Sequence, residues 1–589
     1  MTDESVKSDP VPNRGGVVRR FDASGPVLML FSGILVLLIV LPLIWLILFA
    51  FASKDGGFTI ANFVTIFGDP AFQEPLVTTL IIAVSVGLIC SIVAAPMGWL
   101  VARSDMPGRG VVRTLVTASF VTPPFLGAIA WELLAAPNSG LLNQAWRGLT
   151  GAQPDQHLLN IYTLPGVIFV IVCYTFPYVF VLVANALDRV PGELEDASSM
   201  LGARSWTTAR RITIPMALPA ILAGMLIAFL QAMNLFGSPA ILAIPAGFHT
   251  MTTKIWTLFQ FPPKLELAAA AAVPLLVLTV VLLRAQAQVL GRRSYAVLGG
   301  KYGAPRPVPL GAFRWLAFAL CMALLMLPVF LPYGALFNAA FSKFPSKILT
   351  WETLSMQNVH FTFFELSQTW HVMKNTFLLG ALSATLGTVM ALVISYLAIR
   401  KAVRGHQMLG FLATAPIAIP GIVLGVGLFL AYTRPWISVG GIDIPPIVLY
   451  GTLWILLIAY VTIELPAAYQ QLSSSLQAVH VELEEASRIL GATRLKALRQ
   501  ITAPLLLSGV IATWCFIFVA VVRELSAAAI LFTSDTKVLS VLIFDLKESG
   551  DLGAIAVLGL TMLVVTTIVI AGANLIPGTR HGMGQRRDG

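Results

Sequence analysis

The residues of this chain with the clearest potential for a specific function lie in a polar segment that occurs twice. The first copy spans 196–215 and begins Asp-Ala-Ser-Ser-Met-Leu-Gly, and the second spans 485–504 and begins Glu-Ala-Ser-Arg-Ile-Leu-Gly. Each copy places glycine and proline 13 residues apart, and the two lie 289 residues apart. Both interrupt long apolar runs. A charged segment duplicated in this way predicts two equivalent docking surfaces.

Each copy predicts two short helices joined at a glycine. Acidic residues come first, where the dipole and unpaired N–H groups of a helix N-terminus favour negative charge. The glycine ends that helix, because glycine adopts the left-handed conformation without steric cost. An amphipathic connector resting on lipid headgroups is the alternative for one copy, but nine matches over twenty aligned positions favour docking. The expected docking residues are Glu195, Asp196, Ala197 and Gly202, and Glu484, Glu485, Ala486 and Gly491.

A second polar feature interrupts two apolar runs at the same offset of 289 residues. Arg-Glu-Leu-Ser stands at 523–526, and Asn-Leu-Phe-Gly-Ser-Pro stands at 234–239. Charged or helix-breaking residues at membrane depth are tolerated where they face protein or line a cavity. The alternative is that the arginine and glutamate reach the membrane surface or pair with each other. The expected pathway or gate residues are Asn234, Phe236, Ser238, Pro239, Arg523, Glu524 and Ser526.

Other polar residues predict neither catalysis nor metal binding. Glu464, its counterpart Thr175, and Glu132 are expected to make contacts between helices rather than bind substrate. The seven histidines lack zinc-site spacing, and the four cysteines all fall within apolar runs. No Gly-x-x-x-x-Gly-Lys-Ser/Thr, His-Glu-x-x-His or Gly-x-Ser-x-Gly occurs, so neither a nucleotide-phosphate site nor a hydrolase centre is expected.

The composition predicts a protein that crosses the membrane many times. Apolar residues make up 57% of the chain, charged residues only 11%, and the mean hydropathy is +0.84. A span needs about 20 apolar residues to cross the hydrocarbon core. Twelve spans are predicted at 27–51, 76–102, 112–136, 163–187, 214–242, 267–290, 311–340, 374–399, 408–432, 447–472, 503–531 and 552–577.

The basic residues predict the orientation. With the N-terminus inside, 27 of the 38 lysines and arginines fall on the cytoplasmic side, which follows the positive-inside rule. Both duplicated segments and both termini are then cytoplasmic. Topology accounts for most of the net charge of +10, so no nucleic-acid partner is expected. The first span is expected to be a retained helix rather than a signal peptide.

The duplication extends over two halves of six spans. Because six is even, both halves cross the membrane in the same sense, which indicates a parallel rather than an inverted repeat. The expected organisation is a cytoplasmic tail at 1–26, a first half at 27–290, a cytoplasmic linker at 291–310, a second half at 311–577 and a cytoplasmic tail at 578–589.

The duplicated segment resembles the EAA loop of permease subunits of binding-protein-dependent ABC importers. The resemblance implies an all-α polytopic fold of the type I importer (MetI-like) class. It also implies that each short helix is a coupling helix seated in one of two ATP-binding subunits, and that a periplasmic solute-binding protein delivers the substrate. ATP and Mg would be bound by those ATPases, with no cofactor on this chain. Asp196 stands where the family has Glu, with Glu195 beside it, so which acid makes the contact is left open.

The sequences at 523–526 and at 138–143 (Asn-Ser-Gly-Leu-Leu-Asn) also resemble the fused permeases for ferric iron. This resemblance implies an importer of ferric iron in the bacterial inner membrane. Importers of thiamine, 2-aminoethylphosphonate or polyamine are the alternatives. An ion-coupled secondary transporter is the alternative of another class, although the most strongly repeated element is cytoplasmic rather than at the membrane midplane.

Overall fold

The computed structural model describes residues 24–53, 57–291, 307–401, 405–433, 437–439, 442–444 and 448–575. The predicted all-α fold is confirmed: the described residues are helical apart from loops and a hairpin of β1 (Ile437–Val439) and β2 (Ile442–Ile444). Most of the predicted N-terminal tail, most of the predicted linker and the whole predicted C-terminal tail lie outside the described residues.

The first half begins with a span interrupted by one π-helical turn and ends with a long apolar helix. Its elements are α1 (Ser24–Leu35), η1 (Val36–Val40), α2 (Leu41–Ala50), α3 (Ala61–Gly68), α4 (Pro70–Arg103), α5 (Arg109–Val121), α6 (Pro124–Ala135), α7 (Leu141–Thr150), α8 (Leu164–Asp188), α9 (Gly192–Met200), α10 (Ser205–Thr208), η2 (Ala209–Thr213), α11 (Ile214–Asn234), α12 (Gly237–Leu242), α13 (Met251–Phe259) and α14 (Leu265–Gly291).

The second half repeats this order, including the π-helical turns in the first span and before the fifth. Its elements are α15 (Phe313–Leu325), η3 (Met326–Phe330), α16 (Leu331–Phe341), α17 (Gln357–His360), η4 (Phe361–Glu365), α18 (Thr369–Ile399), α19 (His406–Thr414), η5 (Ala415–Ala418), α20 (Gly421–Thr433), α21 (Leu453–Gln477), α22 (Val481–Ile489), α23 (Arg494–Ala497), η6 (Leu498–Thr502), α24 (Ala503–Val522), α25 (Ala528–Leu531), α26 (Leu539–Ser549) and α27 (Leu552–Leu575).

Ten helices among the described residues are long and apolar enough to cross a membrane, and two bent pairs bring the number to twelve if each pair is one span. The bent pairs replace the straight third and ninth spans of the prediction. α5 and α6 meet at 99°, and the segment of α19 and η5 meets α20 at 106°. Pro123 and Pro420 stand at the bends. Proline forces the preceding residue out of the helical region, and Thr122 and Ile419 are indeed extended.

The two halves interlock through their first spans. Within each half, the second, fourth and fifth spans pack together: α4, α8 and α11 in the first, and α18, α21 and α24 in the second. The first spans pack against the sixth span of their own half, α14 or α27, and also reach across. α2 packs against α20 of the second half, and α16 packs against α6 of the first half. The bent span of each half is therefore held by the first span of the other.

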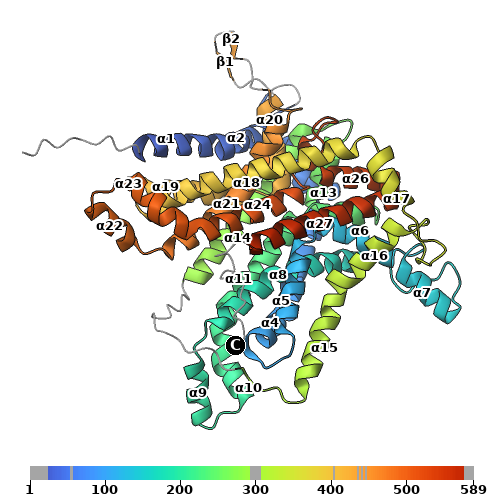
Figure 1. The fold of residues 1–589 in the computed structure, drawn as a ribbon. Helices are drawn as coiled ribbons and strands as arrows, with labels where there is room; N and C mark the ends of the chain where they lie inside the picture. Colours follow the sequence, from blue (N-terminus) through green and yellow to red (C-terminus); the bar gives the residue numbers. More distant parts are fainter. Residues whose placement is uncertain are drawn as a thin grey trace, which may run out of the picture.

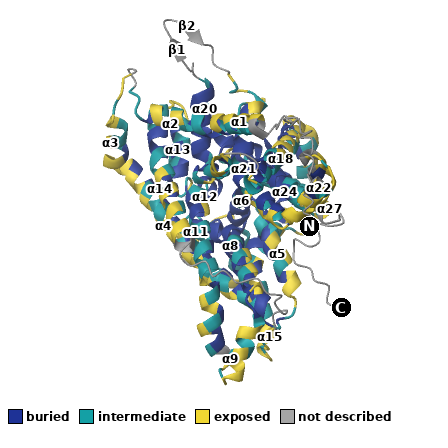
Figure 2. Cartoon of the chain, turned by 90° about the vertical axis from the view of Figure 1, so that its left-hand side faces the viewer, coloured by how far each residue is buried: buried dark blue, intermediate teal, exposed yellow. Residues whose placement is uncertain are grey.

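The arrangement places the duplicated segments at two separate ends of the molecule. In Figure 1, α9 and α10 lie at the foot of the structure and α22 and α23 at its left edge. Figure 2, from another side, also shows α9 and α22 far apart. Buried residues concentrate where the halves converge, around α6, α8, α12, α13 and α20, and exposed residues mark α9 (Figure 2). The halves diverge from this shared core toward their duplicated segments.

Candidate functional site

The duplicated segments form two elbows, which we define as α9–α10 and α22–α23. The helix–glycine–helix geometry predicted from the sequence is present in both. Gly202 has φ of +79° and Gly491 has φ of +92°, so both lie in the left-handed region that glycine adopts most readily. The backbone N–H of the next residue returns to the helix in each copy, from Ala203 to Ser198 O and from Ala492 to Ser487 O, both at 3.1 Å. Each elbow therefore has the same local fold.

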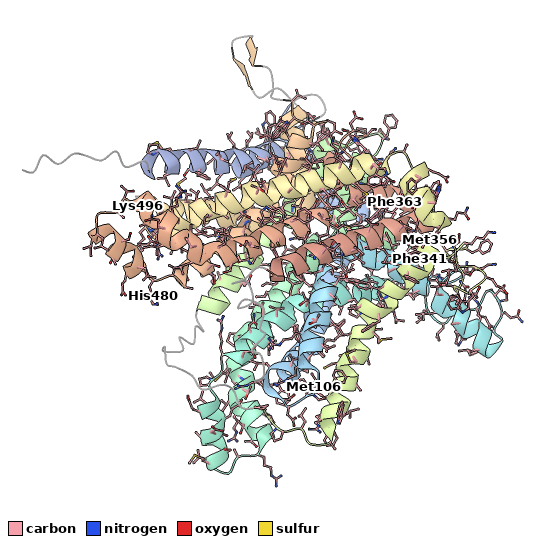
Figure 3. The ribbon with its side chains drawn as sticks, viewed as in Figure 1. Met106, Phe341, Met356, Phe363, His480 and Lys496 are labelled. Atoms are coloured by element: carbon pink, nitrogen blue, oxygen red, sulfur yellow. The ribbon has the colours of Figure 1, made fainter. Side chains whose placement is uncertain are left out.

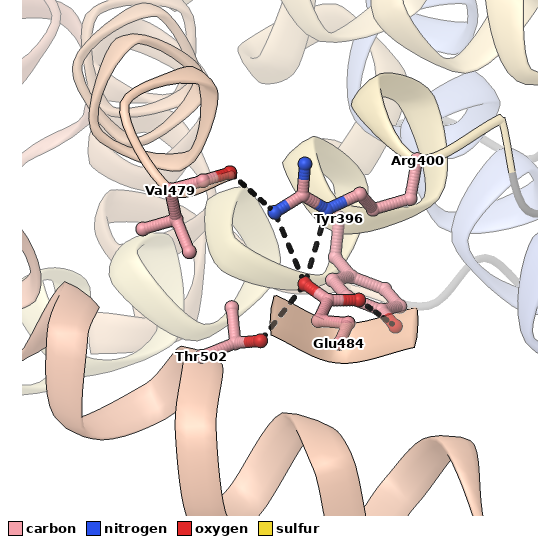
Figure 4. Close-up of polar contacts among 5 residues, drawn as sticks. All are labelled: Tyr396, Arg400, Val479, Glu484 and Thr502. Atoms are coloured by element: carbon pink, nitrogen blue, oxygen red, sulfur yellow. Dashed lines mark hydrogen bonds and ion pairs between the residues drawn. The ribbon is translucent and has the colours of Figure 1, made fainter. Parts of the chain in front are cut away.

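A buried polar cluster holds the second elbow in place (Figure 4). Glu484 Oε1 lies 3.0 Å from Arg400 Nη2 and accepts from Arg400 Nε at 3.1 Å and from the Thr502 hydroxyl at 2.8 Å. Its other oxygen accepts from the Tyr396 hydroxyl at 3.3 Å. Arg400 also donates to the carbonyl of Val479 at 2.9 Å. The glutamate is thus bound by its own chain on both oxygens.

The first elbow has a similar Arg–Glu–Thr group with fewer hydrogen bonds, since Arg103 Nε and Nη1 have no hydrogen-bond partner among the described residues. Arg103 Nη2 donates to Glu195 Oε1 at 3.0 Å, and the Thr213 hydroxyl donates to the same oxygen at 2.8 Å. Arg103 is fully buried. Trp99 lines the space beside this cluster and is the counterpart of Tyr396, so the first copy lacks the tyrosine hydrogen bond. We call these two Arg–Glu–Thr groups the clasps.

Each clasp joins three elements that are far apart in the sequence. The arginine ends the second span (α4) or directly follows it (α18), the glutamate lies in the elbow helix (α9 or α22), and the threonine lies in the π-helical turn before the fifth span (α11 or α24). Removing one partner of a buried ion pair costs about 3–5 kcal/mol, because it leaves an uncompensated charge. Each clasp therefore ties an elbow to the second and fifth spans of its half.

The clasps divide the predicted docking residues into two groups. Glu195 and Glu484 turn inward to the clasp arginines, whereas Ala197, Glu485 and Ala486 are exposed. Asp196 is half-buried, and Gly202 and Gly491 form the exposed turns. A docking role for these residues stays a prediction.

Four clasp residues were not among the predicted site residues: Arg103, Arg400, Thr213 and Thr502. The sequence nevertheless contains features that could have identified them. An arginine follows the second span of each half, and the threonine is one of the nine matched positions of the duplicated segment.

Large apolar side chains project from both elbows at matching positions. Met200 and Leu201 are each 88% exposed, and their counterparts Ile489 and Leu490 are 85% and 90% exposed. His480 and Lys496 flank the second elbow at the left edge of Figure 3, and both are exposed. Exposed apolar groups rimmed by polar residues mark sites of interaction with proteins or membranes. The same pair at both elbows indicates two copies of one interaction surface.

The fifth span of each half ends at the polar feature predicted as a gate. α11 ends at Asn234 and α12 begins at Gly237, while α24 ends at Val522 and α25 begins at Ala528. Both helices are therefore interrupted where the sequence indicated. Asn234, Arg523, Glu524 and Ser526 are half-buried.

Three predicted gate residues of the first half are fully packed. Phe236 contacts the rings of Trp256 and Phe544, with centroids 6.0 and 5.8 Å away. The Ser238 hydroxyl donates to the carbonyl of Pro124 at 2.8 Å, and Pro239 is also buried. α12 thus folds back against the bend of the third span, and these residues close the bundle here rather than line an accessible surface.

Arg523 and Glu524 face different elements. The Arg523 guanidinium donates to the carbonyl of Phe120, lies over its ring, and reaches the Tyr178 hydroxyl at 3.4 Å, so it contacts the first half. The Glu524 carboxylate accepts from the backbone N–H groups of Ala527 and Ala528 at 2.9 and 3.2 Å, which caps α25. The predicted alternative in which the two residues pair with each other is not the observed arrangement.

Glu132 forms another contact between the halves. It accepts a hydrogen bond from the Tyr162 hydroxyl at 2.7 Å and is ion-paired with Lys547 of α26. The contact between helices predicted for Glu132 is confirmed. Burial, together with the nearby carboxylate of Glu132, holds the pKa of Tyr162 well above its usual range, so this phenol remains a donor. Among the described residues, no three His, Cys, Asp or Glu side chains form a group that could hold a metal ion.

Two permease proteins resemble the chain over most of its length. It is 27% identical over 469 residues to the ferric transport system permease protein FbpB of Actinobacillus pleuropneumoniae, which covers 78% of this chain. The chain spans 64% of that relative's length, less than two thirds. It is 22% identical to the Fe(3+)-transport system permease protein FbpB 2 of Haemophilus influenzae, over 85% of this chain and 89% of the relative.

Solved structures and a family profile also match. The crystal structure of a bacterial ABC transporter that imports alginate covers 46% of this chain and 96% of its own, at 20% identity and a TM-score of 0.38. The profile of the family described as "Binding-protein-dependent transport system inner membrane component" matches residues 87–294 and again residues 383–578. These two matches include more than half of the chain. The chain therefore belongs to the family of binding-protein-dependent transport system inner membrane components.

Proposed function

We propose that this protein is the translocation subunit of an ATP-binding-cassette importer in the bacterial inner membrane. A periplasmic binding protein delivers the substrate, and two copies of a separate ATPase dock on the two elbows. The observation that carries the proposal is the repetition of the clasp: each elbow presents exposed apolar residues and is fixed by the same Arg–Glu–Thr group to two spans. Two equivalent surfaces fit two equivalent partners.

The clasps supply a mechanical route from the ATPases to the core. When the ATPases close on ATP, α9 and α22 approach each other, and each clasp moves the second and fifth spans with its elbow. α11 has 21 residues and therefore extends about 30 Å from the first elbow to the break at Asn234. α24 extends from the second elbow to Arg523 in the same way. Movement at the elbows thus reaches the interrupted helices where the halves meet.

The orientation follows from the basic residues. The elbows and the termini are cytoplasmic, because the short loops on that side carry most of the lysines and arginines. The core around α6, α13 and α26 then lies toward the periplasm. ATP hydrolysis belongs to the partner, since the chain has no phosphate-binding loop sequence.

Ferric iron is the substrate that we propose. The support is the similarity, over most of this chain, to two proteins named as ferric transport permeases. Thiamine, 2-aminoethylphosphonate and polyamines are the competing substrates, and the uptake experiment below includes them.

Reconstitution tests the proposal directly. The protein is placed in proteoliposomes with the ATPase and the binding protein encoded beside it, and uptake of radioactive iron is followed with ATP inside the vesicles. We expect uptake that requires ATP and the iron-loaded binding protein and that persists when an ionophore collapses ion gradients. Uptake that requires an ion gradient and does not require ATP would identify a secondary transporter. ATP-driven uptake of a competing substrate in place of iron would overturn the substrate assignment alone.

A further inference from the structure

Glu464 is a carboxyl group near the middle of a membrane span, and the sequence predicts for it a contact between helices rather than substrate binding. It lies in α21, which has 25 residues, and it is half-buried although most of its neighbours are buried. It makes no hydrogen bond to any residue that the structure describes, and it interacts electrostatically with Arg523 and Glu524. Ionisable residues within a span that face the protein interior mark substrate pathways.

The surroundings of Glu464 bring further oxygen atoms to the same place. Tyr460 stands four residues earlier, on the same face of α21. Its hydroxyl is buried, interacts electrostatically with Glu524, and makes no hydrogen bond within the described part of the chain. Gly421, at the bend of the ninth span, approaches Glu524 so closely that a methyl group there would lie 3.5 Å from its Oε1. The group therefore lies where α20, α21 and the break after α24 meet.

Carboxyl groups outnumber positively charged groups in this cluster. Two carboxyl groups face one guanidinium, and Arg523 is already engaged by the carbonyl of Phe120 in the first half. The first half offers nothing comparable. The positions equivalent to Tyr460, Glu464, Arg523 and Glu524 hold Ile171, Thr175, Asn234 and Leu235.

We propose that Glu464, Glu524 and Tyr460 form a transit site for a hard, multivalent metal cation, contributed by the second half alone. The inference rests on the proposed function and names the side chains that contact its substrate. Carboxylate and phenol oxygens are the donors that hard cations prefer. A site that lacks a complete ligand cage also suits passage, because a transported ion must leave as readily as it enters. An anionic substrate such as a phosphonate would meet two carboxyl groups and be repelled.

Binding of terbium(III) to the purified full-length protein in nanodiscs tests the site without the ATPase or the binding protein. Terbium is a hard trivalent cation whose luminescence is excited through nearby tyrosines. Glu464→Gln is the principal variant, because the loss of this carboxylate breaks no hydrogen bond among the described residues. Glu524→Gln keeps an oxygen that can cap α25. Glu548→Gln, an exposed carboxylate at the end of α26, is the matched control.

We expect Glu464→Gln and Glu524→Gln each to weaken terbium binding by about tenfold, and Tyr460→Phe to remove the luminescence sensitised from this site. Arg523→Gln is expected to tighten binding by about threefold, because the site loses its only positive charge. This opposite sign separates a cation site from general damage to the fold. Glu464→Gln binding terbium as tightly as Glu548→Gln would overturn the inference.

The same variants in the uptake assay keep the two proposals distinguishable. If the wild-type protein imports iron with ATP and Glu464→Gln does so equally well, the importer function is supported and the transit site is contradicted. If the wild-type protein shows no ATP-driven uptake of any substrate, the proposed function itself is contradicted.

Discussion

Arg400 and Glu484 form a buried ion pair, with Nη2 and Oε1 3.0 Å apart, between the end of the second span and the elbow helix of the second half. Arg103 and Glu195 repeat the pair at the same distance in the first half. Two sequence segments that look like surface loops are thereby tied into the bundle. The pair joins a short, largely exposed helix to the end of the second span.

Breaking one clasp should destabilise the protein. Glu484→Gln leaves the Arg400 guanidinium without its counter-charge in a site where both side chains are 8% exposed, and we expect a loss of about 3–5 kcal/mol, seen as a lower midpoint of thermal unfolding in detergent. The matched control is Asp188→Asn, which breaks the exposed pair with Arg113 at the same distance of 3.0 Å and should cost at most about 1 kcal/mol. Equal effects of the two changes would contradict a special role for the clasp.

Charge reversal at the elbow should uncouple the partner without unfolding the protein. Glu485→Lys combined with Gly491→Pro changes an exposed acid and the left-handed turn. We expect loss of ATPase co-purification and of uptake, with a lower thermal midpoint because proline cannot adopt the positive φ of Gly491. Leu490→Asp should abolish both at an unchanged thermal midpoint, by removing an apolar contact. Leu149→Asp, at an equally exposed leucine of α7, is the control that should retain the ATPase. Normal uptake by the Glu485→Lys/Gly491→Pro protein would make the docking assignment wrong.

The interlocking of the halves should depend on one glycine. Gly427 of α20 lies against α2 of the first half, where an added methyl group would stand 2.7 Å from the carbonyl oxygen of Pro42. Gly427→Ala should therefore cost about 1–3 kcal/mol through overpacking. Gly110→Ala, in α5 with nothing within 4 Å, should leave the unfolding midpoint unchanged or raise it. An unchanged unfolding midpoint of Gly427→Ala would show that α2 does not pack as closely against α20 as it does in the structure.

Tyr162 should titrate at higher pH than an ordinary tyrosine. Burial raises its pKa first and the carboxylate of Glu132 second, so its neutral form stabilises the fold. That contribution is complete below the ordinary pKa of 10.0 and is lost only as the pH rises through the raised value. The phenolate absorbance of wild type minus that of Tyr162→Phe measures the pKa. Glu132→Gln should lower it while leaving it above the ordinary value, and an ordinary pKa in wild type would contradict the contact.

Much of this architecture is readable from the sequence because it depends on local signals. Gly202 and Gly491 predict the turns of the elbows, and runs of apolar residues predict the spans. The breaks after Asn234 and Val522 follow from polar residues where a helix should continue. Each of these features depends on residues that are close to it in the sequence, so residue pattern and spacing are enough to predict it.

The clasps and the bends depend on tertiary packing and are therefore harder to predict from the sequence. Arg103 and Glu195 are 92 residues apart, and a charged residue at the end of a span is normally explained by topology alone. Pro123 and Pro420 predict an interruption but not a bend of about 100°, which depends on the helices that fold back against them. The packing of each first span against the other half leaves no pattern in the sequence, since most faces of such a helix are apolar.

The role of the clasp in transmitting movement is tested most directly with a protein from which both charges of one clasp have been removed. Arg400→Met with Glu484→Leu leaves no buried charge unpaired, so the thermal midpoint should recover most of what Glu484→Gln loses. When this variant is reconstituted with the proposed ATPase and binding protein, we expect the complex still to hydrolyse ATP but to import iron at less than about a tenth of the wild-type rate, as expected when a remote positioning contact is lost. Import at the wild-type rate per ATP hydrolysed would contradict the claim that the clasp transmits movement from the elbow to the spans.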